Sequence, residues 1–472
     1  LSVWAMNFSM MIGLAVGIDY SLFIVTRYRE ERHDGRDALD AIAATLSTAG
    51  KAVFLSALTV VLSLAAVFLV PIMVFRSMAL GMILSVVAVA LASLTLLPAV
   101  LVALGDRVLR TRGNKDPGHS AESRWARWTG MALRRPALTL VVGLVLLLAL
   151  AAPALGMRLG MPGAQVVDRG HSSRDGYDLV TEGFGPGAAA PLFITTTTAT
   201  ADAVVAAATA DPGVTGAQVA APPASTGRAA IKVIPRTGVD NPATSALVAR
   251  LRTTLARTIP NARVGGPAAQ NHDLTAVLTG RAPLAIAVIM IVAFVLLLVV
   301  FRSLTIAISS ILLNLVGVGA AFGFATLVFQ YGVGASLIGI QPQGFVDAWA
   351  PLFFFALLFG LSMGYQLFLL AAIKERYDAT GDAQLAVRDG IARTGRPITN
   401  AALIMIVVFV AFGVTGPIPP TELGITLALA VLLDATVIRM MLVPAIMGLL
   451  GERSWWLPAV LDRHLPVVRF SH

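Results

Sequence analysis

Asp19 is an acidic residue inside the first apolar stretch of the chain, and it is the only formally charged residue between Leu1 and Arg27. A carboxylate at the depth of a lipid bilayer is costly unless it is neutral, paired or in contact with water. Such an acid can take up a proton from one side of a membrane and release it to the other as the helices move. The alternative is a protonated Asp19 that bonds a neighbouring helix for packing alone.

The composition is that of a polytopic membrane protein. The chain is 57% hydrophobic and only 13% charged, and its mean hydropathy is +0.81; soluble domains average about 25% charged residues. The net charge of +9 does not indicate nucleic-acid binding, because Lys and Arg cluster beside apolar stretches. The absence of Cys excludes disulfides and thiolate sites. The six His have no ligand spacing, so we predict neither a metal site nor a cofactor.

Nine apolar stretches are long enough to cross a bilayer, which takes about 20 residues. They are 3–26, 52–74, 77–104, 136–156, 281–301, 304–329, 350–373, 398–415 and 422–449. Lys and Arg crowd the segments after the first, third and seventh stretches, whereas 330–349 and 416–421 contain neither. The positive-inside rule places the cationic segments in the cytoplasm. The large polar insertion is then outside and the C-terminal tail is cytoplasmic.

The insertion, residues 157–280, has the pattern of a small α+β domain. Strands are predicted at 191–198, 214–221, 229–235 and 262–266, and helices at 201–210 and 245–256. The order β-α-β-β-α-β is typical of the split βαβ, or ferredoxin-like, arrangement. The Thr-rich run in the first strand could instead be a disordered polar tract, but two helical patterns follow it.

The membrane part repeats itself at an offset of 345 residues, which aligns Asp19–Phe23 with Gly364–Phe368. Similar pairs at the same or nearly the same offset are Arg29-Glu30 with Lys374-Glu375, Gly50-Lys51 with Gly395-Arg396, and Leu97-Pro98-Ala99 with Val443-Pro444-Ala445. Transporters are often built from such repeats, with their sites at the repeat interface. The first copy is the shorter one. We therefore expect a leading span, an outer domain and two more spans upstream of Leu1.

The stretch GLAVGIDYSLFIVTRYREE (13–31) resembles the signature of the MMPL family, the mycobacterial-membrane-protein-large transporters of the RND superfamily. Four more segments resemble family motifs in the same order, namely GFGPGAAAPL (183–192), VGGPAAQNHD (264–273), LLFGLSMGYQLFLLAAIKERY (357–377) and LLDATVIRMMLVPAIM (432–447). The resemblance covers the whole chain. It implies a polytopic α-helical membrane protein of the RND/MMPL type with one extracytoplasmic, ferredoxin-like α+β porter domain.

The resemblance also implies a division of the chain. Residues 1–109 would be three transmembrane helices that close the first repeat, and 136–156 the transmembrane helix that opens the second. The remaining parts would be a cytoplasmic or interfacial linker (110–135), the porter domain (157–280), a five-helix transmembrane bundle (281–449) and a cytoplasmic tail (450–472).

In this family a pair of Asp-Tyr dipeptides forms the proton-coupling site, so the resemblance implies a proton relay of Asp19, Tyr20 and Tyr365. The second Asp is absent, because its position is Gly364. Asp19 could still bond Tyr365 and carry one proton, while Tyr20 would lack its acidic partner. Residues that could support the relay are Ser56, Gln366 and Asp434. Asp434 could stabilise the core beside the relay or pair loosely with Arg439, and we expect Arg439 to extend its side chain toward the cytoplasm.

Two G-x-x-x-G patterns indicate close helix packing. One consists of Gly13 and Gly17, and the other of Gly360 and Gly364. Gly364 could therefore serve packing at a position where other family members place an acid.

The resemblance implies an exporter of lipid or hydrophobic metabolites in the plasma (inner) membrane, driven by the proton gradient and needing no other cofactor. Its expected partners are a hydrophobic or lipid substrate, the lipid bilayer, and a homo-oligomer or accessory envelope proteins, but no nucleic acid. An ATP-driven pump is disfavoured because the chain has no G-x-x-x-x-G-K-[ST] loop. An enzyme would need a nucleophile with its base, or a metal cluster, and neither is evident. The alternative is a non-transporting scaffold or a decayed copy, since the second relay Asp is Gly364 and the expected upstream part is missing.

Overall fold

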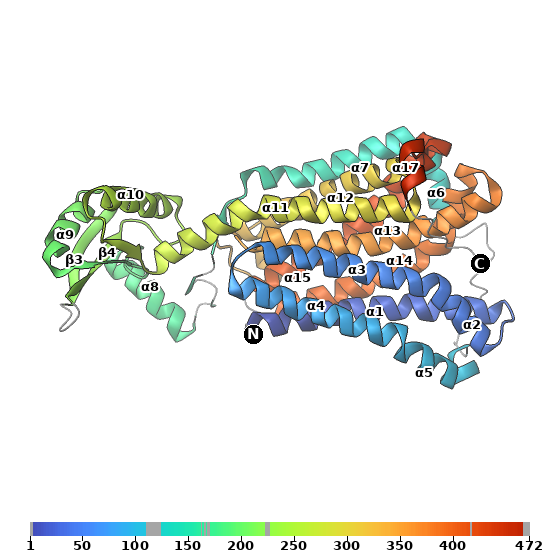
Figure 1. The fold of residues 1–472 in the computed structure, drawn as a ribbon, viewed down its shortest axis with the longest axis horizontal. Coiled ribbons are helices and arrows are strands. Elements are labelled where there is room, and N and C mark those ends of the chain that lie inside the picture. The colour runs from blue at the N-terminus through green and yellow to red at the C-terminus, as the bar shows by residue number, and fades with distance from the viewer. Residues whose placement is uncertain are drawn as a thin grey trace.

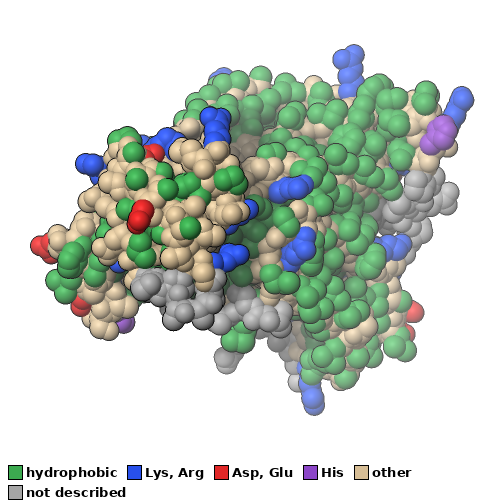
Figure 2. Space-filling view, turned by 60° about the vertical axis from the view of Figure 1, so that its left-hand side comes forward, with side chains coloured by type: hydrophobic (Ala, Val, Ile, Leu, Met, Phe, Trp, Pro, Cys, Tyr) green, Lys and Arg blue, Asp and Glu red, His purple; other side chains and the backbone are tan. Residues whose placement is uncertain are grey.

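The computed structural model describes residues 3–109, 124–161, 163, 164, 167, 170–221, 227–415 and 418–465. A long helical bundle carries a small α/β domain at one end (Figure 1). Within the described residues, nine helical stretches are long and apolar enough to cross a membrane, one for each stretch expected from the sequence. Apolar side chains cover most of the visible face of the bundle (Figure 2). Much of the predicted linker (110–123) and the end of the tail (466–472) lie outside the described residues.

The bundle consists of long helices, several of which continue into short helical turns. The long helices are α1 (Val3–His33), α3 (Lys51–Ala65), α4 (Met73–Leu94), α7 (Pro136–Ala151), α11 (Pro267–Phe301), α12 (Leu304–Ala325), α13 (Ala350–Thr380), α14 (Ala383–Thr415) and α15 (Ile418–Leu433). The shorter pieces are α2 (Ala38–Thr45), η1 (Leu46–Gly50), η2 (Ala66–Leu69), α5 (Leu96–Leu104), η3 (Gly105–Leu109), α6 (Arg124–Arg134), η4 (Ala152–Gly156), η7 (Thr326–Gln330), η8 (Ala335–Ile338), η9 (Asp434–Leu442), α16 (Val443–Leu450), η10 (Gly451–Trp455) and α17 (Ala459–His464).

The central helix of the bundle is α13. Its most apolar 18-residue window is 89% buried, whereas that of the peripheral helix α7 is only 11% buried. Helix α13 packs against α3, and α1 packs against α14. Under the 345-residue repeat α1 corresponds to α13, and α3 corresponds to α14. The two contacts are therefore equivalent, as expected for two copies that face each other.

Phe23 and Phe368 mark the interface between the two copies. They are equivalent under the repeat, and their rings stack with centroids 3.8 Å apart and planes 5° apart. Two equivalent residues can touch each other only near the axis that relates the copies. The approximate symmetry axis therefore passes close to this ring pair, one helical turn from Asp19.

The domain predicted as the porter domain, a name kept below for this α/β unit, is built on a four-stranded antiparallel sheet of order β3-β4-β2-β5. Its elements follow the chain as β2 (Leu192–Thr197), α9 (Ala201–Thr209), β3 (Val214–Ala221), β4 (Arg228–Pro235), α10 (Pro242–Thr258) and β5 (Arg263–Gly265). This is the β-α-β-β-α-β order predicted from the sequence, and the Thr-rich run belongs to β2. Alternate residues of β2 and β4, such as Ile194 and Ile231, are fully buried in one core with Leu247 and Leu251 of α10. A helix that the sequence analysis did not predict, α8 (Ser172–Phe184), precedes the sheet.

Two connections join the porter domain to the bundle. Helix α11 runs without a break from the porter domain into the bundle, so the boundary expected at residue 280 lies inside one helix. Gly266, at φ 97°, turns the chain from β5 into α11, and a Cβ there would come within 2.8 Å of the Pro191 carbonyl oxygen. The second connection is a short parallel pair, β1 (Leu159–Gly160) with β6 (Val346–Asp347), just before α13.

Candidate functional site

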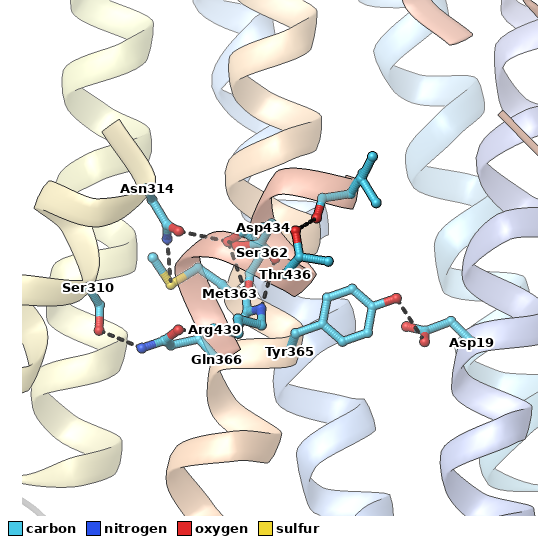
Figure 3. A network of polar contacts seen from close by, with 11 residues as sticks. Asp19, Ser310, Asn314, Ser362, Met363, Tyr365, Gln366, Asp434, Thr436 and Arg439 are labelled. Atoms are coloured by element: carbon cyan, nitrogen blue, oxygen red, sulfur yellow. Dashed lines mark hydrogen bonds and ion pairs between the residues drawn. The ribbon is translucent and has the colours of Figure 1, made fainter. Parts of the chain in front are cut away.

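Asp19 of α1 and Tyr365 of α13 meet in the middle of the bundle. The Tyr365 hydroxyl donates a hydrogen bond to Asp19 Oδ1 at 3.1 Å (Figure 3). Both side chains are buried, with exposed fractions of 7% for Asp19 and 2% for Tyr365. The structure thus brings together two of the predicted relay residues, one from each copy of the repeat.

Tyr20, the third predicted relay residue, points elsewhere. Its hydroxyl lies 3.4 Å from Ser56 Oγ on α3, and both residues are buried. Ser56 in turn packs against Gly364, where an added Cβ would collide with Ser56 Oγ. Tyr20 therefore contacts a serine hydroxyl on the side where the second Asp-Tyr dipeptide would provide an acid.

Arg439 is completely buried beside Tyr365, so the expectation that its side chain extends to the cytoplasm is wrong. Its Nε donates to Asp434 Oδ2 at 2.8 Å, and one terminal nitrogen donates to Gln366 Oε1 at 3.0 Å. The other terminal nitrogen donates to the Ser362 carbonyl and hydroxyl oxygens. The guanidinium carbon also lies 5.4 Å from the centre of the Tyr365 ring. The apolar surroundings leave the guanidinium no route to water, and these acceptors replace its hydration.

The local backbone explains why Asp434 and Arg439 can pair. They belong to η9, a nine-residue π-helical segment. Five residues apart in an α-helix, two side chains lie on different faces, because one turn takes about 3.6 residues. The wider i→i+5 turn of a π-helix brings them to the same face. Trp128 of α6 donates its indole N–H to the Met440 carbonyl oxygen at 3.0 Å, which provides a partner for a carbonyl of this segment.

Polar side chains of α12 complete the network and were missed by the sequence analysis. Ser362 Oγ lies 2.7 Å from Asn314 Oδ1 and 2.8 Å from Asp434 Oδ1. Gln366 Nε2 donates to Ser310 Oγ at 2.9 Å. Ser310 and Asn314 are four residues apart in an apolar helix, and that spacing on one helical face was the available signal.

One cavity is lined by the network residues, and another lies beyond Phe23 and Phe368. One, of about 20 Å³, is lined by Asn314, Ser362, Tyr365 and Asp434, and such a volume has room for roughly one water molecule. The other, of about 120 Å³, has Phe23, Phe368, Glu30, Glu375 and Arg393 among its lining residues. It lies at the end of the bundle away from the porter domain, and Phe23 and Phe368 separate it from Asp19.

The larger cavity is lined by equivalent residues of the two copies. Arg393 lies 3.6 Å from a Glu30 carboxylate oxygen and 3.8 Å from a Glu375 carboxylate oxygen. These two acids are equivalent under the 345-residue offset. Arg393 of α14 thus pairs with the equivalent acid of each copy, and these two ion pairs link α1 to α13 at the cavity.

The glycines of both G-x-x-x-G patterns lie at close helix contacts. A Cβ at Gly13 would collide with Ser85 Oγ, and one at Gly17 would lie 3.4 Å from Val89 on α4. A Cβ at Gly360 would lie 3.0 Å from the Cα of Val60 on α3. Small residues at these positions let the helix backbones approach. Among the described residues, no group of three or more His, Cys, Asp or Glu is arranged to hold a metal ion.

Comparison with known proteins gives one consistent result. The family model described as "MMPL family" matches residues 1–139 and 188–467. The chain is 37% identical over 490 residues to the mycolic acid-containing lipids exporter MmpL11 of Mycolicibacterium smegmatis, covering 100% of this chain and 51% of that protein. It is 36% identical over 491 residues to the heme uptake protein MmpL11 of Mycobacterium tuberculosis, covering 100% of this chain and 50% of that protein.

The chain therefore spans about half the length of these curated relatives. A putative membrane protein of Streptomyces coelicolor, SCO6666, is 38% identical over 478 residues, which cover 98% of this chain and 64% of that protein. Among solved structures, SecDF in its super-membrane-facing form matches with a TM-score of 0.57 at 16% identity, covering 95% of this chain and 55% of that one. At this identity the likeness concerns the fold alone.

Proposed function

The chain belongs to the MMPL family, and from this premise we propose that it works in a proton-driven transporter of lipids or other hydrophobic molecules in the plasma membrane. The names of two relatives, a lipid exporter and a heme uptake protein, support a hydrophobic cargo. The multi-pass bundle and the porter domain that it carries are the parts such a transporter needs.

The observation that carries the proposal is the bond between Tyr365 and Asp19. It joins the two copies of the repeat through one buried acid, at the interface where repeat transporters place their coupling sites. A neutral Asp19 can remain buried, whereas a charged Asp19 needs a partner or water. Gain and loss of one proton at Asp19 therefore favour different arrangements of α1 and α13.

The Arg439–Asp434 pair sets the electrostatics of this step. Its two charges balance each other, so the buried network is neutral when Asp19 is protonated. When Asp19 loses its proton, Arg439 is the nearest cation, reached through the Tyr365 ring and hydroxyl. Gly364 supplies no second acid, so we propose one proton per cycle. One charge crossing the field contributes about 2.3 kcal/mol per 100 mV, enough to bias a two-state bundle.

The direction of the proton follows from the proposed topology. The cationic segments place the porter domain outside and the C-terminus in the cytoplasm. The cavity lined by Arg393 then faces the cytoplasm and gives a route for proton release. The stacked rings of Phe23 and Phe368 lie between this cavity and Asp19 and block the route. Rotation of this ring pair would open the route.

We propose export of a lipid or hydrophobic metabolite, with a homo-oligomer or accessory envelope proteins as partners. The test compares cells that lack the gene with cells complemented by the wild type, by Asp19→Asn, or by Asp34→Asn, whose side chain is exposed. We expect the wild type and Asp34→Asn to restore export of the envelope lipid that accumulates in cells lacking the gene. Asp19→Asn should fail to restore it at equal protein level. If the wild type restores no transport in either direction although it is folded, the non-transporting scaffold replaces this proposal.

A further inference from the structure

Two buried acidic residues lie next to each other at the end of the bundle that faces the porter domain. Asp347 belongs to β6 and Glu422 to the start of α15, and both are 0% exposed. The Asp347 backbone N–H donates to Glu422 Oε2 at 3.4 Å. Neither carboxyl takes part in any of the ion pairs found within the described residues. This pair is separate from the Asp19 network.

The polar atoms at this junction are short of partners. Asp347 Oδ1 and Glu422 Oε1 are buried and accept no hydrogen bond from the described residues. Thr426 lies one turn after Glu422 on the same face of α15. It is fully buried, and its hydroxyl has no partner among the described residues either. Buried polar groups are nearly always bonded in native proteins, so these three atoms indicate a missing donor.

A proton supplies that donor. Two neighbouring buried carboxylates repel each other, so one of them holds a proton. The protonated carboxyl becomes an O–H donor and can bond an oxygen of its neighbour. One bound proton therefore removes the repulsion and adds one donor beside the unpartnered oxygens.

The porter domain contributes a third acid. Asp240 lies in the turn before α10, and its Oδ1 is buried and has no partner in the described part of the chain. Burial raises the pKa of Asp240 to about 6. Burial likewise raises the pKa of Asp347 to about 7; the bond from the Trp349 indole opposes this rise and the charge of Asp240 adds to it. The porter domain thus acts electrostatically on the pair.

No buried cation faces the pair from the described elements packed around it. The elements packed beside β6 carry Arg158, next to β1, and Tyr331, after η7, and both side chains are exposed. The polar residues next to Glu422 on α15 are Thr421 and Thr426, and Trp349 precedes α13; none of these side chains carries a charge. The acids Asp240, Asp347 and Glu422 therefore determine the charge at this junction.

We propose that Asp347 and Glu422 form a second proton-binding site, at the junction of the bundle and the porter domain, and that the bound proton holds the β1–β6 strand pair closed. The strands are joined by the Val346 N–H to the Arg158 carbonyl oxygen at 2.8 Å and by the Ala348 N–H to the Gly160 carbonyl oxygen at 2.7 Å. Loss of the proton leaves two nearby charges with one protein donor each, the Trp349 indole for Asp347 and the Asp347 backbone N–H for Glu422, so the remaining oxygens need water. Entry of water separates β6 from α15 and loosens β1.

This site would give the porter domain its own response to protons, because β1 lies where the chain leaves the bundle for that domain. Use of the response in transport rests on the proposed function, whereas proton binding does not. The direction in which the stability of the junction changes with pH follows from the raised pKa of Asp347. The closed junction is most stable at low pH and loses stability as pH rises from about 4 to about 7. For each proton released on opening, the equilibrium constant for opening increases by up to about tenfold per pH unit.

Hydrogen exchange of residues 158–160 and 346–348, in the whole protein in lipid nanodiscs and corrected for intrinsic rates, tests the proposal. We expect opening of the wild type to increase with pH, and the double variant Asp347→Asn/Glu422→Gln to stay closed at every pH, because amides mimic protonated acids. Asp19→Asn should keep the wild-type pH dependence, so failure of transport and failure of this site are distinguishable. Exchange that does not change with pH in the wild type would overturn the proposal.

Infrared absorption of protonated carboxyl groups gives a second reading that does not depend on strand opening. With Asp19→Asn as the background, we expect a protonated carboxyl signal at neutral pH that Glu422→Gln removes or shifts. Glu452→Gln, at an exposed position, is the matched control and should leave the signal unchanged. Absence of the signal in the Asp19→Asn background would also contradict a proton at this pair.

Discussion

Ser56 occupies the space that a side chain at position 364 would need. An added Cβ at Gly364 would collide with Ser56 Oγ and lie 3.1 Å from Ser56 Cβ. The same Oγ lies 3.4 Å from the Tyr20 hydroxyl. The glycine and the serine therefore form one packing arrangement, in which α13 approaches α3 closely and the position equivalent to Asp19 has no acid.

This contact predicts coupling between the two positions. We expect Gly364→Ala to destabilise the protein by about 1–3 kcal/mol through overpacking, and Ser56→Ala to recover part of that loss in the double variant. Unfolding in mixed micelles would measure the coupling free energy, expected at about 0.5–3 kcal/mol. Gly280→Ala is the control, because no described atom outside its own helical turn lies within 4 Å of a Cβ at that glycine. Additive effects of Gly364→Ala and Ser56→Ala would contradict a direct contact.

The two tyrosines of the repeat should differ in importance. Tyr365→Phe removes the only protein hydrogen bond seen for the Asp19 carboxyl within the described residues, whereas Tyr20→Phe removes a long contact with Ser56. Hydrogen bonds to charged groups contribute about 1.5–3 kcal/mol. We therefore expect Tyr365→Phe to slow proton-coupled transport about tenfold or more, and Tyr20→Phe to have a much smaller effect. Equal effects of the two changes in a transport assay would count against the proposed relay.

Arg439 should be among the most sensitive residues for folding. Arg439→Gln leaves Asp434 buried without its partner, which costs about 3–5 kcal/mol in comparable buried pairs. The double change Asp434→Asn/Arg439→Gln should be less destabilising than Arg439→Gln alone, because no unpaired charge remains. Arg439→Lys should rescue little, since an ammonium cannot bond Asp434, Gln366 and Ser362 in one plane. Thermal unfolding of the purified variants, with Arg463→Gln at an exposed position as control, would measure these differences.

The porter domain should lose one stabilising ion pair in acid. Arg250 bonds both carboxylate oxygens of Asp211 at 2.8 and 2.9 Å and holds the pKa of Asp211 below its usual range. A lowered pKa means stability that is present above the ordinary value near 4 and is lost as pH falls through the folded pKa.

Asp211→Asn keeps an acceptor for the Gly213 N–H but loses the charge. We expect faster hydrogen exchange in β3 than in the wild type at neutral pH, and a difference that shrinks below about pH 4. Asp202→Asn, on the exposed side of α9, should match the wild type throughout. A deficit for Asp211→Asn that persists unchanged in acid would show that its charge is not the cause.

Much of the fold follows from local patterns in the sequence. Apolar runs of about 20 residues and the alternation in the porter domain, as in Leu192 and Ile194, are visible in any one segment. The nine spans and the order of strands and helices along the porter domain were therefore predictable. The ends of the helices were less predictable from the sequence. Helix α11 begins at Pro267, well before its apolar stretch, because its first turns pack on the porter domain core through Ala268 and Ala269.

The site was predictable only in part, for a physical reason. Asp19 stands out as a lone acid in an apolar helix, and the repeat pairs it with the segment that contains Tyr365. The burial of Arg439 depends on acceptors 73 and 77 residues away, in Gln366 and Ser362, and on a π-helical turn that has no clear local signature. Asp347 and Glu422 are 75 residues apart, and only the tertiary fold places them in contact.

The central claim is that one proton at Asp19 couples the two copies of the bundle. The most direct measurement is proton flux into liposomes that contain the protein isolated from its native membrane, driven by a pH gradient and followed with an enclosed pH-sensitive dye. We predict flux for the wild type and for Asp34→Asn, and none above empty liposomes for Asp19→Asn at equal reconstitution. Undiminished flux through Asp19→Asn would contradict the account.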